Sequence, residues 1–453
     1  MTETSTQASR PAFTTGLPHV AYVLLWYPLF TQPFIFREVE GLKGLLPLSV
    51  YSLYGPNLRH CSNEMRAVAG ETHTYGMRAL GRVLGECFRQ VLLHPLRTGR
   101  LFRKAIFRHW RSWETLGENL WAFCIGMYLG RLFEESGIDM IYAPWPRGTA
   151  TAAWVAAQIA GVPFATAARG DNLEPADPDL GNKLSAAFFV RANNEADKKR
   201  IEVFDKGQAL GKGQALGKVE LIYNSLTLPP LPPETEGTAP SAQAQEPVPM
   251  DRPVRLLALG RFDVTKGFDV LIKACGILRD RGLDFRLTLA GGGGAVMGLG
   301  RMEAEILRLR ETLHLEDRVS LPGIISHNEL PRILAEHDIF AAPCVVHESG
   351  RRDGIPNTVI EALAYGLPVV STTVNALPEV VIDGKTGLAV PPNNPEALAD
   401  ALLRLADNAP LAQTLALNGK HLAASMFDPT RNNKRLADVF IKHYTIWKKK
   451  CAA

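Results

Sequence analysis

Short apolar runs alternate with amphipathic stretches in the first half of the chain. Patterns typical of buried strands lie at His19–Trp26, Pro47–Tyr54, Asp139–Trp145 and Phe164–Ala168. A helix rich in small residues is predicted for Thr149–Ala160, directly before the last of these strands. Strands that alternate with helices predict a parallel sheet with helices on both faces.

The same alternation restarts in the second half. Strands are predicted at Val254–Gly260, Phe285–Ala290, Val319–Leu321, Ile339–Ala342 and Val369–Ser371. Helical spacing of apolar residues predicts helices at Phe268–Arg281 and Arg301–Leu313. We therefore expect an α/β protein of two facing, doubly wound, Rossmann-like domains. Ligands of such sheets bind at the carboxyl ends of the strands, so the expected site lies between the domains.

A proline-rich segment separates the two halves. Residues 228–252 combine prolines with Glu, Thr, Ser and Gln and have no periodic apolar face, which is typical of a linker. We predict an N-terminal domain over residues 17–227 and a C-terminal domain over residues 253–428. A perfect tandem repeat, KGQALG at residues 206–217, is predicted to lengthen a surface loop.

Length, charge and composition exclude several classes of protein. The chain has 453 residues, which suits two or three domains, and its net charge of +4 is too small for a dedicated nucleic-acid binder. The six cysteines have no metal-ligand spacing and fit a reducing compartment. The polar N-terminus carries no secretory signal, and no apolar run approaches the ~20 residues of a spanning helix. We therefore expect a cytoplasmic protein without a nucleic-acid partner.

The most informative stretch is Asp353–Pro368, DGIPNTVIEALAYGLP. A helix is predicted for Thr358–Tyr365, with Pro356 suited to its first turn. The amide groups at such a helix start form an anion site. Asp353 and Glu361 would then flank one phosphate-sized pocket. The alternative is that Asp353 only caps the helix and Glu361 forms a surface ion pair.

Two glycine-containing loops follow predicted strands. In GRFDVTKG, Gly260–Gly267, the cations Arg261 and Lys266 could neutralise a diphosphate leaving group without a metal, or could be ordinary solvated charges. The run Gly291–Gly294 permits close backbone approach to a ligand, but it fits a flexible loop equally well.

Together these segments resemble the nucleotide-sugar domain of glycosyltransferase family 4. The family pattern has a GR…KG loop, a Gly-rich turn, two carboxylates eight positions apart and an EA-x-A-x-G-x-P-V-V signature, here Glu361–Val370. The resemblance covers Val254–Leu405. It implies the GT-B fold, a last helix over residues 429–450 that packs back toward the N-terminal domain, and a retaining hexosyltransferase-type enzyme. It also implies no metal and no cofactor, the nucleotide-sugar being a co-substrate.

The resemblance and the local charge pattern together predict the site residues. Catalytic roles are predicted for Asp353, Arg261, Lys266 and Arg169. Donor binding is predicted for Gly260, Gly291, Gly292, Ile355, Pro356, Asn357, Thr358 and Glu361. The family implies that Glu361 binds the donor ribose and that Asp353 lies by the transferred sugar.

Two positions depart from the family pattern. Asp353 stands where the family usually has glutamate, so the backbone lies closer, the donor contact differs or activity is weaker. Arg169-Gly170 stands where many members have His-Gly. Arginine cannot act as a base, so Arg169 would support the leaving phosphate or the acceptor. Its alternative is a structural ion pair with Asp171 or Glu174.

The first domain resembles the family more loosely. Residues 27–38 are similar to the first-strand loop of members that build polysaccharides, which implies a glycan or lipid-linked glycan acceptor in cell-surface polysaccharide biosynthesis. The two departures also permit a non-catalytic nucleotide-sugar or glycan-binding protein on the same fold. A dinucleotide oxidoreductase is disfavoured, because no GxGxxG follows an early strand.

A basic segment suggests a further partner. Residues 89–111 contain seven Arg or Lys, no acidic residue, and interleaved bulky apolar side chains on a helix predicted after Pro95. This pattern suits a segment at an anionic membrane surface, and the expected location is then peripheral on the inner face of the cell membrane. The alternative is an apolar core face opposite a solvated basic face. Lys448–Lys450 could add to the attachment.

Overall fold

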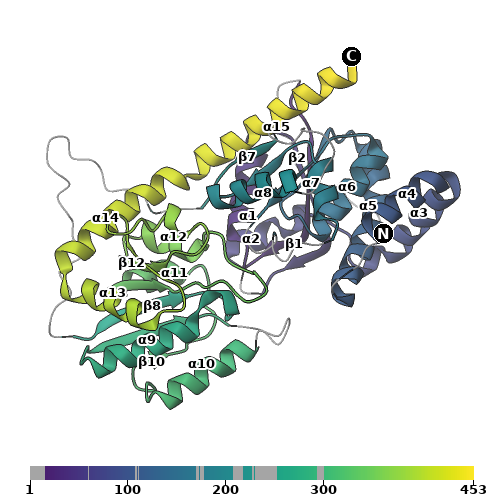
Figure 1. Ribbon diagram of the computed structural model, residues 1–453. Helices are drawn as coiled ribbons and strands as arrows, with labels where there is room; N and C mark the ends of the chain where they lie inside the picture. The colour runs from purple at the N-terminus through teal and green to yellow at the C-terminus, as the bar shows by residue number, and fades with distance from the viewer. Residues whose placement is uncertain are drawn as a thin grey trace, which may run out of the picture.

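Two α/β domains follow each other along the chain (Figure 1). The computed structural model describes residues 16–59, 61–107, 110, 112–169, 173, 178–207, 218–226, 229, 252–292 and 300–452. The expected linker, apart from Pro229 and Arg252, and residues 208–217 of the tandem repeat lie outside the described residues. The predicted fold class, two doubly wound parallel-sheet domains, is confirmed.

The first sheet has seven parallel strands in the order β3-β2-β1-β4-β5-β6-β7. They are β1 (Val20–Leu29), β2 (Leu48–Asn57), β3 (His73–Thr74), β4 (Met140–Ala143), β5 (Phe164–Ala168), β6 (Val190–Ala192) and β7 (Val219–Leu221). Val20 of β1 pairs with Leu48 of β2 on one side and with Met140 of β4 on the other. The strand order therefore reverses between β1 and β4, which makes this the switch point of the domain.

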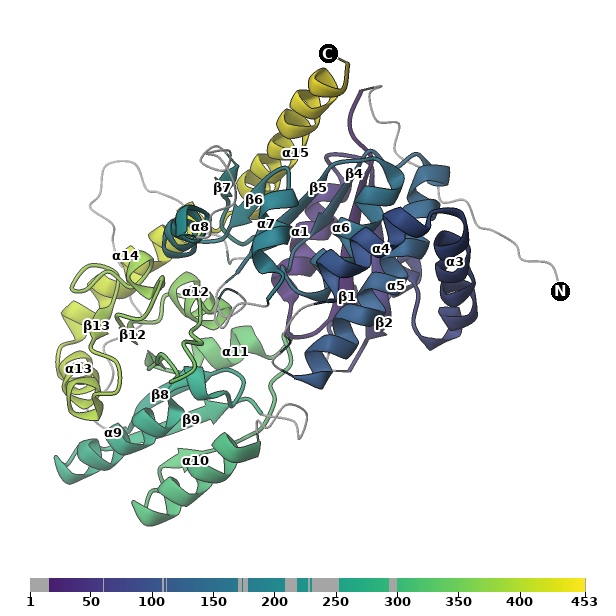
Figure 2. The same ribbon diagram turned by 45° about the vertical axis from the view of Figure 1, so that its right-hand side comes forward.

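Helices cover both faces of this sheet. They are α1 (Pro33–Lys43), α2 (Asn63–Ala67), α3 (Leu80–Leu93), α4 (Pro95–Ala105), α5 (Trp113–Ser136), α6 (Gly148–Ala160), α7 (Leu180–Ala186) and α8 (Glu195–Gly207). The helices α3 and α4 lie on the outer side of α5, at the end of the molecule away from the C-terminal domain (Figures 1 and 2). No helix that the structure describes is both long and apolar enough to cross a bilayer.

The second sheet has six parallel strands in the order β10-β9-β8-β11-β12-β13. They are β8 (Val254–Leu259), β9 (Phe285–Ala290), β10 (Val319–Ser320), β11 (Ile339–Ala342), β12 (Val369–Thr372) and β13 (Leu388–Val390). Its helices are α9 (Phe268–Asp280), α10 (Gly300–Thr312), α11 (Leu330–Ala335), α12 (Asn357–Ala364), α13 (Pro395–Asp407) and α14 (Ala409–Met426). The switch point of this sheet lies between β8 and β11.

The strands predicted from the sequence are present, and three of them have the predicted bounds: Phe164–Ala168, Phe285–Ala290 and Ile339–Ala342. The prediction for Pro356 is wrong in one respect. Its backbone is extended, with φ −62° and ψ 134°, so it caps α12 from outside and the first helical residue is Asn357.

The last helix, α15 (Pro429–Ala452), runs from the C-terminal domain back along the N-terminal domain (Figure 1). Its Phe440 ring packs on Tyr142 and Phe189, with ring centroids 5.1 and 5.7 Å away. Asn433 accepts a hydrogen bond of 2.6 Å from the Ser225 hydroxyl. The helix α15 therefore contributes side chains to the core of the first domain.

A carboxylate of the C-terminal domain joins the two domains. Glu379 lies in the short helix η6 (Leu377–Glu379) and accepts hydrogen bonds of 3.0 Å from the amides of Glu195 and Ala196. It also accepts a hydrogen bond of 2.9 Å from the Tyr223 hydroxyl. A negative charge at the start of a helix is favourable, so Glu379 stabilises the first turn of α8 from the other domain.

Candidate active site

Three loops meet at the carboxyl ends of the central strands of the second sheet. They follow β8, β9 and β11, and they carry Gly260, Gly291 and Asp353. Because β8 and β11 are neighbours at the switch point, these loops edge the crevice where ligands of doubly wound sheets bind.

The glycines of the first two loops pack backbone against backbone. A Cβ atom on Gly291 would lie 1.8 Å from the carbonyl oxygen of Gly260, so no larger residue fits there. The Gly291 amide donates to the Gly323 carbonyl at 2.8 Å, and the Phe262 amide donates to the Gly292 carbonyl at 3.3 Å. These bonds fix the position of Gly260, Gly291 and Gly292. Gly293 and Gly294 lie outside the described residues.

Lys266 and Asp353 form an ion pair between the β8 and β11 loops. Lys266 Nζ lies 3.0 Å from Asp353 Oδ2, and both side chains are mostly buried. The same oxygen accepts a hydrogen bond of 3.2 Å from the Thr265 hydroxyl. Burial alone would lower the pKa of Lys266, but the charge of Asp353, the hydrogen bond to it and the neighbouring Cys344 together raise the pKa. Lys266 is therefore cationic at neutral pH.

A second set of contacts holds this pair in place. Asp263 accepts hydrogen bonds from the Thr265 amide at 3.0 Å, from its hydroxyl at 2.9 Å and from Arg351 at 2.8 Å. The side chain of Asn375, a residue with a left-handed backbone (φ 48°), donates to the Asp353 carbonyl at 2.8 Å. Sequence reasoning did not single out these residues. The Asp-x-Thr spacing in DVT is a capping pattern and could have indicated the first contact.

The cation Arg261 lies on the same loop and is exposed. Its positive charge lowers the pKa of Lys266, which offsets part of the effect of Asp353. The loop after β8 therefore carries two cations, of which Lys266 is balanced by Asp353 and Arg261 is exposed.

The helix α12 begins next to this pair, and Ile355 and Pro356 lead into it from Asp353. The amides of Asn357 and Thr358 belong to the first turn, which leaves such groups without intrahelical partners. Glu361 lies one turn further on. Burial raises the pKa of its carboxyl group to about 8. Among the described residues, no hydrogen bond or ion pair joins Glu361 to Lys266 or Asp353.

A chain of side chains links Arg169 to α12 across the domain boundary. Arg169 donates a hydrogen bond of 3.0 Å to Asn224 Oδ1, and Asn224 Nδ2 donates one of 3.3 Å to Asn357 Oδ1. The guanidinium of Arg169 lies 5.1 Å from the rings of both Phe34 and Trp145. Sequence reasoning did not predict this link.

Arg169 also lies above a buried ionic cluster that the sequence did not reveal. Glu38 Oε2 is 3.8 Å from Arg169 and accepts a hydrogen bond from Arg191, and Glu38 Oε1 accepts one of 2.6 Å from the Tyr22 hydroxyl. Burial would raise the pKa of Glu38, but the two guanidinium charges lower it. Asp171 and Glu174, the expected ion-pair alternatives for Arg169, lie outside the described residues.

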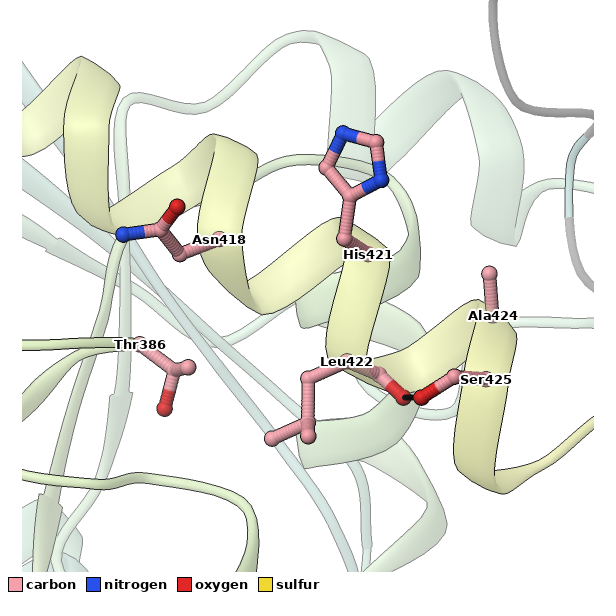
Figure 3. Close-up of a pocket in the computed structure, with 6 residues that line it drawn as sticks. All are labelled: Thr386, Asn418, His421, Leu422, Ala424 and Ser425. Carbon is pink, nitrogen blue, oxygen red and sulfur yellow. Dashed lines mark hydrogen bonds between the residues drawn. The ribbon is translucent and has the colours of Figure 1, made fainter.

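A shallow depression of about 580 Å³ lies elsewhere on the C-terminal domain (Figure 3). It is lined by Thr386, Asn418, His421, Leu422, Ala424 and Ser425. None of the predicted site residues lines it. Among the described residues, no three His, Cys, Asp or Glu side chains stand together in a way that could hold a metal ion.

Comparison with known proteins adds three findings. Residues 253–408 match the family model of glycosyl transferases, group 1. The chain is 32% identical over 189 residues to the proposed colanic acid biosynthesis glycosyltransferase WcaL of Salmonella typhimurium, covering 41% of this chain. It is also 32% identical to the amylovoran biosynthesis glycosyltransferase AmsK of Erwinia amylovora, over 42% of this chain. Both matches span 45% of the relative, which is less than half of its length.

The fold as a whole has solved counterparts. Anabaena HepE, whose crystal structure contains UDP, superposes with a TM-score of 0.65 over 93% of this chain and 98% of its own, at 16% identity. At that identity the likeness establishes the GT-B architecture alone.

Proposed function

We propose that the protein moves a sugar from a nucleotide-sugar donor to a glycan or lipid-linked glycan acceptor, because residues 253–408 match the family model of group 1 glycosyl transferases. We assign it to cell-surface polysaccharide biosynthesis, in line with the names of WcaL and AmsK. The observation that carries this proposal is the Lys266–Asp353 pair beside the start of α12.

The proposed chemistry is transfer with retention of anomeric configuration and without a metal. As the bond from the sugar to the diphosphate breaks, negative charge grows on the departing phosphate oxygens. Lys266, Arg261 and the first amides of α12 would stabilise that charge by fixed electrostatics. Asp353, which is held against Lys266, would lie by the transferred sugar.

The remaining predicted residues would orient the substrates. Glu361 would accept hydrogen bonds from the ribose hydroxyls of the donor, and Gly260, Gly291 and Gly292 would permit the donor to approach the backbone. Arg169 would support the leaving phosphate or the acceptor. Its link through Asn224 to Asn357 would transmit its position to α12.

Donor binding and turnover test the proposal directly. Thermal-shift measurements with UDP-, GDP- and ADP-sugars should raise the unfolding temperature with at least one donor, since a ligand that binds only the folded state stabilises it. Release of the nucleotide in the presence of acceptor should follow. A donor that binds but never turns over would instead assign a non-catalytic binding function, and no shift with any donor would refute the proposal.

Replacing Glu361 with glutamine should weaken donor binding by roughly 1.5–3 kcal/mol, because the neutral amide loses charge-assisted hydrogen bonds to the ribose. Titration calorimetry with the preferred donor would measure this loss. Glu379→Gln, at a carboxylate of the same domain that contacts the domain boundary, is the matched control and should keep donor affinity. Unchanged affinity in Glu361→Gln would remove Glu361 from the site.

The pKa of Glu361, about 8, also predicts a pH dependence. Without donor, the carboxyl group is protonated below pH 8, and binding to the ribose as a carboxylate must release that proton. Donor affinity should therefore rise with pH toward 8, by at most about tenfold per unit, and then level off. Glu361→Gln should flatten this profile.

The same carboxyl group should make the stability of the protein fall as pH rises, whereas donor affinity rises. The folded protein keeps the Glu361 proton up to about pH 8, whereas the unfolded chain loses it near the ordinary value of 4.5. This group therefore costs stability progressively as pH rises from 4.5 to 8. A Glu361→Gln variant with the same stability profile as the wild type would contradict the burial of this carboxyl group.

Attachment to an anionic membrane surface is the last part of the proposal. The basic residues of 89–111 and Lys448–Lys450 would hold the protein at the inner face of the cell membrane, where lipid-linked acceptors are accessible. Each cation close to such a surface contributes about 1 kcal/mol.

A further inference from the structure

The outer face of α3 is apolar. Leu84, Phe88, Val91 and Leu92 follow helical spacing along it, and their side chains are between 49% and 67% exposed. Further exposed apolar residues continue from the end of α3 through the chain after α4: Leu93, Leu96, Phe102, Phe107 and Trp113. Monomeric soluble proteins rarely expose apolar side chains as a continuous patch.

The inner face of α3 combines the buried Val83 with two buried polar side chains. Glu86 and Gln90 are buried, and Gln90 donates a hydrogen bond of 2.7 Å to Glu86. Arg131 of α5 lies 3.1 Å from Glu86, and Arg97 of α4 donates to Gln90 at 2.8 Å. Together with the buried Val83, these polar contacts hold this face of α3 inward. The exposed apolar face is therefore the consequence of a specific packing arrangement.

Positive charge borders the apolar face. Arg100, Arg103 and Lys104 of α4 are exposed, and the sequence between Cys87 and Trp113 contains no acidic residue. A second copy of this chain would bring like charges together on this face. An anionic lipid surface matches both properties, since it attracts the cations and takes up the apolar side chains.

We propose that α3 and α4 form a membrane-binding hairpin, which inserts the apolar face of α3 into the interfacial layer of an anionic bilayer. The inference deepens the proposed membrane attachment and rests on it, because the basic segment alone would only adsorb to the surface. The hairpin lies at the end of the N-terminal domain that is remote from the C-terminal domain (Figure 1). Insertion therefore leaves the crevice at β8 and β11 unobstructed.

Substitution of apolar residues outside the basic segment 89–111 separates insertion into the bilayer from attraction between charges. Leu84→Gln/Phe88→Gln keeps every charge and changes only exposed side chains of α3. Leu307→Gln on α10 is the matched control for Leu84→Gln, since the two leucines are 46% and 51% exposed. Co-sedimentation with phosphatidylglycerol–phosphatidylcholine vesicles is measured for each variant at about 0.1 M and about 0.5 M salt, which screens surface charge.

The wild type should bind at the lower salt and keep part of its binding at the higher. The double variant should bind about tenfold or more weakly and lose its salt-resistant part, whereas Leu307→Gln should match the wild type. Arg100→Glu/Arg103→Glu/Lys104→Glu should abolish the salt-sensitive part. Equal binding by the double variant and the wild type would overturn the inference, as would no wild-type binding to these vesicles at either salt concentration.

Two further measurements distinguish membrane binding from self-association and from the enzymatic proposal. Light scattering that shows a dimer, which Leu84→Gln/Phe88→Gln dissociates, together with no vesicle binding, would assign the face to a second copy. Thermal shift with the donor separates this inference from the enzymatic proposal. Vesicle binding without a donor-induced rise in the unfolding temperature would refute the transferase function and support the membrane-binding hairpin. A donor-induced rise without vesicle binding would support the transferase function and refute the membrane-binding hairpin.

Discussion

Asp353→Asn is expected to abolish sugar transfer, with a loss of at least about 10³-fold in the transfer rate. The substitution keeps the size of the side chain but removes the negative charge that lies 3.0 Å from Lys266. That ammonium group would then be mostly buried without its counter-charge, and the group beside the transferred sugar would be neutral. Asp353→Glu, which restores the residue usual in the family, should retain or raise the rate.

The expected loss must be separated from a loss of stability, because removing one partner of a buried ion pair also destabilises the fold. Asp269→Asn breaks a pair with Lys273 on α9 that is more exposed, and it serves as the control. Rates are compared at a temperature where calorimetry shows both variants folded. Full transfer by Asp353→Asn would reduce Asp353 to a structural partner of Lys266.

Lys266→Ala is expected to lower turnover by about 10²–10³-fold, the usual cost of removing one preorganised charge from a developing anion. The raised pKa of Lys266 means that the wild type presents this charge over the whole neutral range. The loss should therefore be independent of pH between about 6 and 9. Single-turnover measurement of nucleotide release, at saturating donor, reports the chemical step.

Lys273→Ala on α9 is the matched control for Lys266→Ala, since it removes a lysine from an ion pair of the same domain. The double variant Lys266→Ala/Asp353→Asn completes a double-mutant cycle, which measures the coupling between the two residues. If the two residues act as a unit, its turnover should be close to that of the worse single variant. Normal turnover of Lys266→Ala without added metal would exclude Lys266 from the stabilisation of the diphosphate.

The sheets could be predicted from the sequence because buried parallel strands are short and continuously apolar. Phe164–Ala168 and Ile339–Ala342 have no exposed residue, and turn or helix signals bound each of them. Once these strands are located, the loops after β8 and β11 can be placed as well, because the carboxyl ends of parallel strands lie at the same edge of the sheet. The topology brings these two loops together, but the Lys266–Asp353 ion pair itself was not predicted.

Contacts that depend on three-dimensional packing could not be predicted. Glu38 and Arg191 are 153 positions apart, and no local pattern pairs them. Glu379 stands in PEVV, but only the arrangement of the two domains brings its carboxylate to the first turn of α8. A helix over Leu80–Leu93 was not predicted from the sequence, and the structure shows that Val83, Glu86 and Gln90 form the buried face of α3.

The path of α15 bears on how the protein is made. Phe440 packs on Tyr142 and Phe189, and Asn433 is hydrogen-bonded to Ser225, so the first domain lacks part of its core until α15 has been translated. Domains usually fold in the order in which they leave the ribosome. Here the nascent N-terminal domain must wait, with Tyr142 and Phe189 uncovered, while the whole C-terminal domain is synthesised. Co-translational folding of this chain therefore ends with the first domain, and a ribosome-bound fragment that stops before Pro429 should engage chaperones.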